Sequence, residues 1–379
     1  MFRPTITAAL AALALAGAGL AVPTVTAAPA DPPTPKTLAK GLMTPLSVAV
    51  ARDGTVFYSQ NFAGQIHKLG PGKKPKRVYA VKTPGDEAGA LSWRAGELTF
   101  AITPGGPPEE RRGLTKLGLG HQKAAAARAG SARVMVVKKS GAVRKLADLG
   151  AHEAKHNPDG GVTYGFVGIS DECAAQLPPD VGPATYQGED YSHPYATTST
   201  REKTYVADAG ANDVVSISRS GKVRTVAVLK PAEVPVTAEL AAGFGLPECA
   251  VGLTYLSEPV PTDIEVHRGR LHVTTLGGGL GEALPLGAVH RINPKTGRVT
   301  TPVSGLSAPV GLGLNPRGTM FVSQLFAGSI VKVPAGSTNA RPYATIAMPA
   351  AIEWDKRGLY ATVRVLSEPP AGKLVRFHR

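Results

Sequence analysis

GTVFYSQNFAGQIHKL, from Gly54 to Leu69, is written a second time in this chain as GTMFVSQLFAGSIVKV, from Gly318 to Val333. The two stretches share ten identical residues and align without a shift in register. Because chance rarely produces so long a match within one chain, it indicates an internal repeat. The remainder of the chain should therefore contain further copies of the same unit.

Each copy lies within a longer unit of four short strands. In the first unit, alternating apolar residues predict strands over 46–50, 55–59, 65–69 and 75–81. The turn Arg52-Asp53-Gly54 between the first two strands is a strong hairpin signal. The same pattern recurs with different residues in units that begin near Pro45, Pro84, His193, Pro261, Pro309 and Pro349.

The spacing of these units predicts an all-β fold, a six-bladed β-propeller of four-stranded antiparallel blades. Where no insertion intervenes, the units repeat about every 40 residues, which is the spacing of propeller blades. The last unit has three strands before the chain ends, and the segment 35–42 (PKTLAKGL) aligns with the fourth strand of the unit that ends at Leu306. We therefore predict that the N-terminal strand closes the ring by pairing with the C-terminal blade.

The N-terminal residues 1–28 have the pattern of a secretory signal peptide. A single early Arg3 precedes an apolar run over 6–22, and small residues follow at 26–28. We expect a short linker over 29–36 and a single propeller domain over 37–379. No later stretch reaches 18 consecutive apolar residues, so we expect no transmembrane segment. The sequence thus predicts a secreted, extracellular protein, which we expect to be a monomer.

Four insertions interrupt the units, at about 103–131, 150–192, 231–260 and 277–286. Each precedes a first or a third strand of its blade, so all four should emerge on one face of the disc, here named the top face. Loop elaboration on a rigid scaffold is where binding sites usually lie. Cys173 and Cys249 fall in two neighbouring insertions, and an even pair of cysteines in an exported protein favours a disulfide over two buried thiols.

The charge is unevenly distributed. The formal net charge is +14, yet the three connections 83–89, 150–193 and 231–263 hold 14 of the 28 acidic residues and one base, Lys155. An acidic top face on a basic body favours cations, metals or amine-bearing ligands there, and we expect a small molecule, a glycan or a protein as its partner. The segment 109–145 instead has ten bases against two acids, which is typical either of a solvated loop or of a site for an anionic envelope polymer. Because aromatic residues are not interleaved with these bases, we expect no nucleic-acid partner.

Polar residues just ahead of the first strands and in the loops before the third strands should converge on the top mouth of the central channel. This predicted ligand-binding set consists of Asn61, Asp86, Glu87, Asp190, His193, Asn212, Glu258, Asp263 and Gln324. Oxygen ligands suit Ca²⁺, and Asp86, Asp190 and Asp263 are the candidate calcium ligands. Carboxylates with a His could also perform acid/base chemistry. The alternative is that these side chains bind no ligand and only contact water in the channel or cap turns.

The stretch HEAKH, from His152 to His156, matches the H-E-x-x-H zinc signature. That signature requires a helix, and Asn157-Pro158 follows at once in a glycine-rich stretch. We therefore expect a coincidence or loop hydrogen bonding here, or a contribution to a looser cation site.

The sequence resembles the ScyD/ScyE family of exported propellers over nearly the whole length from Thr37 to Arg379. The resemblance lies in the stretches EPVPTDIEVHRGRLHVTTLGGG, TYVADAGANDVVSI, CAVGLTY and GKLVRFHR. It implies a six-bladed propeller, similar to those of NHL repeats, outside the cytoplasm. It implies no catalytic residues, because the family name carries no catalytic set. The blade pattern is more distantly similar to lactonohydrolase, strictosidine-synthase-like and streptogramin lyase propellers, whose signature acid and His positions have no match here.

Three functional hypotheses follow from the sequence. The first is a propeller that binds a ligand or partner through its acidic, disulfide-pinned top face. The second is a metal-assisted hydrolase or lyase that uses carboxylates on the channel axis. The third is a cell-envelope protein that binds polyanions through its basic surface.

Overall fold

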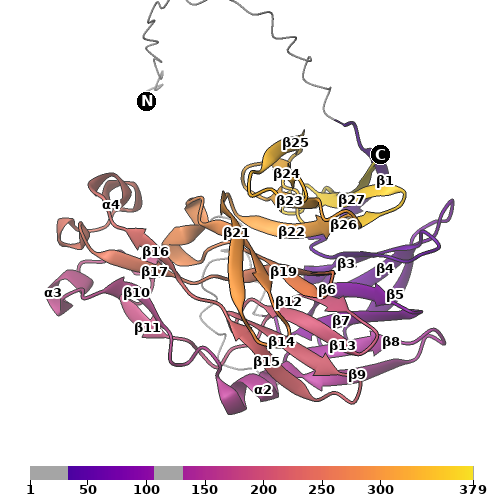
Figure 1. Ribbon diagram of the computed structural model, residues 1–379, viewed down its shortest axis with the longest axis horizontal. Helices are drawn as coiled ribbons and strands as arrows, with labels where there is room; N and C mark the ends of the chain where they lie inside the picture. Colours follow the sequence, from indigo (N-terminus) through magenta and orange to yellow (C-terminus); the bar gives the residue numbers. More distant parts are fainter. Residues whose placement is uncertain (1–32, 106–130, 379) are drawn as a thin grey trace, which may run out of the picture. The chain divides into compact units, whose positions relative to one another are not determined.

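A computed structural model describes residues 33–105 and 131–378, and it contains seven four-stranded antiparallel sheets in these residues (Figure 1). The predicted signal peptide and most of the first insertion lie outside the described residues. Six of the sheets are blades. The first three blades are β2 (Val48–Val50), β3 (Val56–Gln60), β4 (Gln65–Leu69) and β5 (Lys76–Ala80); β6 (Glu87–Arg94), β7 (Glu97–Thr103), β8 (Arg133–Val137) and β9 (Val143–Asp148); and β12 (Pro194–Ser199), β13 (Lys203–Asp208), β14 (Asp213–Ser218) and β15 (Val223–Val228).

The other three blades complete the ring. They are β18 (Pro261–His267), β19 (Arg270–Thr275), β20 (Gly287–Ile292) and β21 (Val299–Leu306); β22 (Pro309–Leu314), β23 (Met320–Gln324), β24 (Ser329–Val333) and β25 (Arg341–Thr345); and β26 (Ile352–Asp355), β27 (Gly358–Val363) and β28 (Gly372–Phe377) with β1 (Lys36–Leu42). The first strands contact one another in the cyclic order β2, β6, β12, β18, β22, β26 and back to β2. The predicted six-bladed propeller is confirmed.

The N-terminal strand closes the ring as predicted. β1 pairs antiparallel with β28, so that Lys36 lies opposite Arg376 and Leu42 lies opposite Gly372. Leu42 is buried in an apolar cluster that includes residues of the first blade. The last blade is therefore complete only when both ends of the chain are in place.

The repeated stretch supplies equivalent parts of the first and fifth blades. Gly54 and Gly318 end the hairpin before the second strand and adopt φ angles of 90° and 94°, which an L side chain would resist. Aromatic residues pack between neighbouring blades, as where the rings of Phe57 and Trp93 stack at 4.9 Å. Alternation therefore buries one face of each blade against the next.

The seventh sheet is built from two insertions and was not predicted. Its strands are β10 (Thr163–Val167) and β11 (Thr185–Gln187) from the insertion at 150–192, and β16 (Ala232–Pro235) and β17 (Thr254–Ser257) from that at 231–260. β10 pairs with β17, so the two insertions share one sheet. It lies to one side of the blades, on the left in Figure 1. Two short helices lie beside it, α3 (Asp171–Ala174) and α4 (Ala238–Phe244), whereas α2 (Leu149–His156) contacts β8 of the second blade.

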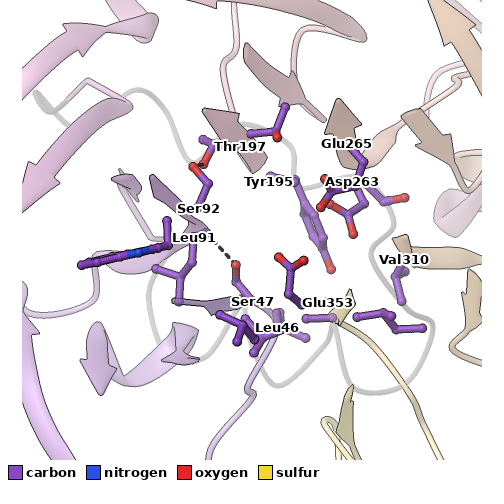
Figure 2. Close-up of a pocket in the computed structure, with 18 of the residues that line it drawn as sticks. Leu46, Ser47, Leu91, Ser92, Tyr195, Thr197, Asp263, Glu265, Val310 and Glu353 are labelled. Carbon is purple, nitrogen blue, oxygen red and sulfur yellow. Dashed lines mark hydrogen bonds between the residues drawn. The ribbon is translucent and has the colours of Figure 1, made fainter. Parts of the chain in front are cut away.

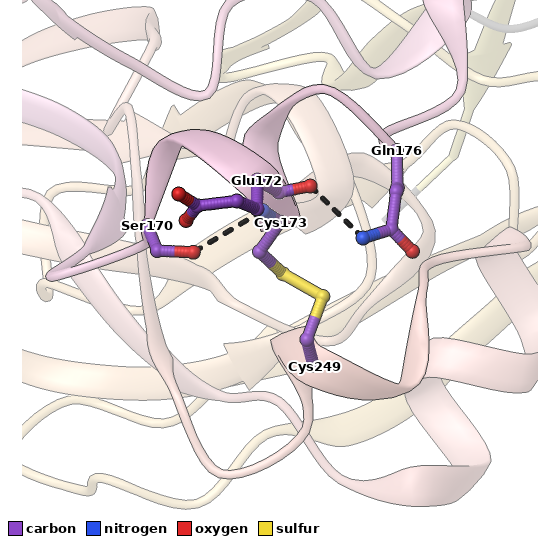
Figure 3. Close-up of a disulfide and its surroundings, with 5 residues drawn as sticks. All are labelled: Ser170, Glu172, Cys173, Gln176 and Cys249. Atoms are coloured by element: carbon purple, nitrogen blue, oxygen red, sulfur yellow. Dashed lines mark hydrogen bonds between the residues drawn. A yellow bond between two sulfur atoms is a disulfide. The ribbon is translucent and has the colours of Figure 1, made fainter.

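The predicted disulfide joins the same two insertions (Figure 3). Cys173 in α3 is bonded to Cys249 in the 3₁₀ helix η3 (Glu248–Ala250), with the two Cα atoms 5.9 Å apart. The Ser170 hydroxyl accepts a hydrogen bond from the Cys173 amide at 3.2 Å and so caps α3. The disulfide lies in a separate apolar cluster that includes Phe166, Val234 and Tyr255. The inserted sheet thus has its own small core.

In the ranges 33–105 and 131–378, no helix has the length and apolar character needed to cross a membrane.

Candidate functional site

A cavity of about 160 Å³ lies on the axis of the propeller (Figure 2). The first strands of all six blades, or the residues beside them, contribute to its lining. It therefore forms part of the central channel. Its size is sufficient for several water molecules or a small ligand group.

Three carboxylates from two blades face this cavity. Asp263 and Glu265 lie on β18, and Glu353 lies on β26. Asp263 is held in place because its Oδ1 accepts a hydrogen bond from the Ile264 amide at 2.7 Å and its Oδ2 accepts one from the Leu312 amide at 2.6 Å. Glu353 Oε1 accepts a hydrogen bond from the Trp354 amide at 3.2 Å. The residues that line the cavity include no Lys, Arg or His, so no base in the lining neutralises the three acids.

The pKa values of these acids are raised. Desolvation is the main cause at each, and it raises the pKa of Asp263 to about 7. Repulsion from Asp263 adds to desolvation at Glu353, whose pKa rises to about 8. Desolvation and repulsion from Glu353 and Asp263 raise the pKa of Glu265. The side chains line a small cavity and are surrounded by protein, which explains why burial dominates. The three carboxylates therefore share protons near neutral pH.

The carboxylates should make stability depend on pH. A carboxyl group whose folded pKa exceeds its unfolded value contributes stability below the unfolded pKa, and this is lost as pH rises through the folded pKa. For Glu353 the loss runs from about pH 4.5 to about pH 8. We expect Glu353→Gln to leave stability at pH 4 nearly unchanged and to raise it at pH 9, as measured by urea unfolding. Equal free energies of unfolding for the two proteins at pH 9 would contradict this account.

Hydroxyl groups from the first three blades also line the cavity. The Ser47 Oγ accepts a hydrogen bond from the Leu91 amide at 2.6 Å, which joins the first two blades. Thr197 Oγ1 donates to the Ala90 carbonyl at 2.7 Å and lies 2.8 Å from Ser92 Oγ. These hydroxyls fix the spacing of neighbouring first strands. This part of the lining is consequently polar and uncharged.

An aromatic ring faces the same space. Figure 2 shows Tyr195, from the first strand of the third blade, near Asp263 and Glu353. Burial and the charges of Asp263 and Glu87 raise the pKa of Tyr195, so its phenol stays neutral at physiological pH. The cavity thus combines carboxylates with an aromatic ring, a pairing that suits a cationic group.

Of the nine residues predicted for the channel mouth, Asp263 is the one that lines this cavity. Asn61 and Gln324 hold loops instead: Asn61 Oδ1 accepts a hydrogen bond from the Ser59 hydroxyl at 2.5 Å, and Gln324 Oε1 accepts one from the Ser307 amide at 2.7 Å. Sequence reasoning missed Glu265 and Glu353.

His193 and its neighbours form a second group, at the entry to the third blade. The backbone amide of His193 donates to Asp208 Oδ1 at 2.6 Å, and the Ser192 hydroxyl donates to Asp208 Oδ2 at 2.5 Å. Desolvation lowers the pKa of His193 to about 4, so the ring is neutral near pH 7. The Tyr191 hydroxyl lies 3.2 Å from His193 Nδ1, so the imidazole is part of a packed polar network.

Asn212 and Glu258 lie where the inserted sheet meets the blades. Asn212 Nδ2 donates to Asp159 Oδ2 at 3.1 Å, and its Oδ1 accepts from the Val260 amide at 3.1 Å, so it joins both insertions. Desolvation raises the pKa of Glu258 to about 7, against a hydrogen bond with Tyr186 that lowers it. These two residues connect the insertions to the blades.

The candidate calcium ligands do not come together. Asp86 lies 3.8 Å from Arg133 Nη2, Asp190 is exposed, and both Asp263 oxygens accept backbone hydrogen bonds. Within the described ranges, no three His, Cys, Asp or Glu side chains are grouped to hold one metal ion. The arrangement of these three residues therefore does not fit a shared calcium ion.

The HEAKH stretch does form a helix, contrary to the expectation of a loop. It lies in α2, which ends at His156, and Asn157 closes it with a φ of 33°. The rings of His152 and His156 lie 4.7 Å apart on the helix surface, whereas Glu153 is 2% exposed and points into the protein. His152 Nε2 lies 3.2 Å from the Thr225 hydroxyl. The two His and the Glu are therefore on different sides of the helix, and this arrangement does not provide the catalytic base of the zinc signature.

Buried carboxylates gather between α2 and the third blade. Glu153, Asp159, Asp208 and Asp213 are each at most 2% exposed. Neither oxygen of Asp213 accepts a hydrogen bond of normal geometry, although the Thr225 hydroxyl is near enough to lower its pKa. Desolvation is the larger effect and, with repulsion from Asp208 and Glu153, raises the pKa of Asp213 well above its usual value. The cluster therefore takes up protons when the protein folds.

Replacing Asp213 with Asn should stabilise the protein at alkaline pH. At pH 4 the carboxyl is protonated in the folded state and about half ionised in the unfolded state, so the pH-dependent contribution is still small and the variant should differ little from wild type. At pH 8 wild type must either bind a proton or bury an unpaired charge, and we expect the variant to be more stable by about 1–3 kcal/mol. Chemical denaturation at both pH values measures this difference. Glu202→Gln, which changes an exposed acid on a hairpin, is the matched control. If the difference in stability between the Asp213 variant and wild type is no larger at pH 8 than at pH 4, the prediction is wrong.

The six blades around a central channel define this protein as a β-propeller, and similar solved structures are propellers. A gluconolactonase from Xanthomonas campestris is similar with a TM-score of 0.51 and 10% identity, over 91% of this chain and 94% of that chain. A protein of unknown function from Bacteroides thetaiotaomicron has a TM-score of 0.51 and 13% identity, over 91% and 72%. A streptogramin B lyase has a TM-score of 0.49 and 16% identity, over 91% and 97%. At these identities the likeness to the first two structures shows the fold alone.

No family model and no curated protein matches the chain. The resemblance to the ScyD/ScyE family therefore stays a prediction.

Proposed function

We propose that this protein is a secreted β-propeller of the ScyD/ScyE type whose central channel binds a small ligand through a cationic group such as a protonated amine. The observation that carries the proposal is the convergence of Asp263, Glu265 and Glu353 on one cavity whose lining contains no base. A cation that enters this cavity relieves the mutual repulsion of the carboxylates. It also replaces the protons that they hold near neutral pH.

An organic cation suits the cavity better than a metal ion does. In the described part of the chain, the carboxylates are not grouped tightly enough for three of them to bind one ion. A protonated amine is larger than a metal ion and can donate hydrogen bonds to separate carboxylates. The Tyr195 ring adds a surface against which a cation packs favourably. The hydroxyls of Ser47, Ser92 and Thr197 can receive or donate hydrogen bonds at the uncharged end of such a ligand.

The top face supports the same preference. Glu258 and Glu282 have pKa values raised to about 7 and about 8, chiefly by desolvation, and both lie near the junction of the inserted sheet with the blades. The disulfide between Cys173 and Cys249 ties together the two insertions that carry much of the acidic charge. The exposed acids of these insertions, such as Asp171, Glu172 and Asp190, are a source of negative field that raises the local concentration of cationic ligands.

Titration calorimetry with a pair of matched probes tests the proposal. We expect 1,3-diaminopropane to bind and 1,3-propanediol, its neutral analogue, not to bind. Each of Glu265→Gln and Glu353→Gln should weaken diamine binding by about tenfold, which corresponds to about 1.4 kcal/mol. Affinity should rise from pH 6 to pH 9 because the carboxylates lose their protons over this range. Equal affinity for the diamine in wild type and in the double variant Glu265→Gln/Glu353→Gln would refute the assignment of the site.

Acid/base catalysis is a second candidate function. The observation that favours it is the raised pKa of Asp263 and Glu353, to about 7 and about 8, because groups that titrate near the working pH are the most effective proton donors and acceptors. In a hydrolase or lyase one of these groups would carry a proton while another accepts one. Turnover of a bound ligand that disappears in Glu353→Gln, while the same variant still binds that ligand, would favour the enzyme over the binding protein.

A further inference from the structure

Bases are concentrated on the face opposite the insertions. This bottom face consists of the hairpins that join first to second strands and third to fourth strands. Every first-to-second hairpin carries an exposed base: Arg52, Arg94, Arg201, Arg268, Arg317 and Lys356. In four of the blades the third-to-fourth hairpin adds two more: Lys73 and Lys74, Lys138 and Lys139, Arg219 and Lys222, and Lys295 and Arg298. Basic residues thus occur around the whole ring.

Few acids offset these bases. Asp53 and Glu202 are exposed on the bottom hairpins, while Glu97 and Asp355 are partly buried. Asp355 pairs with Arg357, whose Nη2 also donates to the Arg52 carbonyl at 3.1 Å. That arginine therefore links the last blade to the first. The exposed bases that remain are free of such structural roles, apart from Arg219, which donates to the Arg201 carbonyl at 2.8 Å.

This distribution of charge differs between the two faces of the propeller. The acidic connections and the channel carboxylates belong to the top face and the axis, whereas fourteen exposed bases lie on the bottom hairpins. None of the bottom hairpins exceeds seven residues, whereas the described insertions at 150–192, 231–260 and 277–286 precede first or third strands and so emerge at the opposite ends of the blades. The bottom face is consequently a broad surface of short turns with positive charge around its whole circumference.

We propose that the bottom face docks the propeller on a bilayer that contains anionic phospholipids, with the top face directed away from it. A two-dimensional array of headgroups can meet bases in all six blades at once, whereas a linear polyanion would cross only some of them. Each base near an anionic surface adds to the attraction. The first-to-second hairpins of the described chain expose no large apolar side chain, and Val143, which borders one third-to-fourth hairpin, is exposed by itself, so docking should be mainly electrostatic and reversible.

Vesicle co-sedimentation of residues 33–379, which form a compact unit without the apolar segment 6–22, tests this inference. The wild type should bind vesicles of mixed phosphatidylglycerol and phosphatidylcholine and should not bind pure phosphatidylcholine. The bottom-face variant K73E/K74E/K138E/K139E should bind the anionic vesicles at least tenfold more weakly. A control with the same net charge, K82E/K230E/K332E/R364E, changes exposed bases outside the bottom hairpins and should lose much less. Raised salt should release the wild type.

Three outcomes would overturn the proposal. If both variants lose binding equally, net charge rather than the bottom face is responsible. If neither loses it, the hairpins are not the contact surface. If soluble polyphosphate binds the wild type while anionic vesicles do not, the partner is a linear polymer and not a bilayer. Unchanged melting temperatures of the variants establish that they are folded, since all eight substitutions are at exposed positions. None of these results depends on ligand binding in the channel.

Discussion

A chain that begins at Met43, and so lacks β1, is expected to lose cooperative folding. Removing β1 takes away its backbone hydrogen bonds with β28 and the burial of Leu42. These together are worth on the order of 5 kcal/mol. That is comparable with the whole stability of a typical domain, about 5–15 kcal/mol. Thermal unfolding followed by near-ultraviolet circular dichroism measures the loss, and the exposed edge of β28 should also promote aggregation.

The control for this truncation is a chain that begins at Pro33 and retains β1. It should unfold at the same temperature as the longer protein. A synthetic peptide of residues 33–43 should restore part of the stability of the shorter chain when it is added in excess, because the strand can pair with β28 in trans. Unaltered melting of the chain that begins at Met43 would show that β1 does not close the ring.

Loss of the disulfide is expected to unfold the inserted sheet before the blades. In the double variant Cys173→Ser/Cys249→Ser, a cross-link across 76 residues is absent. On the chain-entropy model this costs about 4–5 kcal/mol. The inserted sheet has its own small core, whereas the blades are held by their own packing. Limited proteolysis should therefore cut first within the insertions at 150–192 and 231–260, and calorimetry should show an additional transition at lower temperature.

Reductant provides the matched comparison for this prediction. Wild type treated with reductant should behave like the double variant, and the variant itself should not respond to reductant. If the melting of wild type is the same in oxidised and reduced form, the disulfide does not stabilise the inserted sheet.

The blades could be predicted because the sequence signals for each blade lie within its own unit. Each unit carries its own strand alternation and turn residues, and the copies at Gly54–Leu69 and Gly318–Val333 align directly. The inserted sheet could not, because its strands are three to five residues long and β10 pairs with β17 across a whole intervening blade. Such long-range pairing leaves little periodicity in either segment. The disulfide was nevertheless predictable, since only two cysteines are present.

The site was predicted in part for a related reason. Asp263 was chosen because it was expected just ahead of a first strand, whereas in the structure Asp263, Glu265 and Glu353 all lie within first strands. The sequence did contain a signal for them. Each glutamate lies four residues after the proline that starts its unit, Pro261 or Pro349, and an isoleucine directly precedes it. The first and fifth units have Ala49 and Gly313 at this position. Comparing the units position by position would have identified both glutamates.

Several of the other predicted mouth residues interact with neighbouring protein groups. Asn61 in the first copy of the repeat is 9% exposed and hydrogen bonds to Ser59, whereas its counterpart Leu325 is buried among apolar residues. Whether a polar side chain near a strand end faces a channel or a turn depends on distances of a few ångströms. That choice is made by tertiary packing and does not appear in the order of residues.

A crystal structure of the protein with 1,3-diaminopropane at pH 8 tests the central claim most directly. The account predicts one diamine in the axial cavity, with an ammonium group within hydrogen-bonding distance of Glu265 or Glu353, and no diamine there in the Glu265→Gln/Glu353→Gln variant. A diamine bound only at the junction of the inserted sheet, or bound equally in the axial cavity of the double variant, would contradict it.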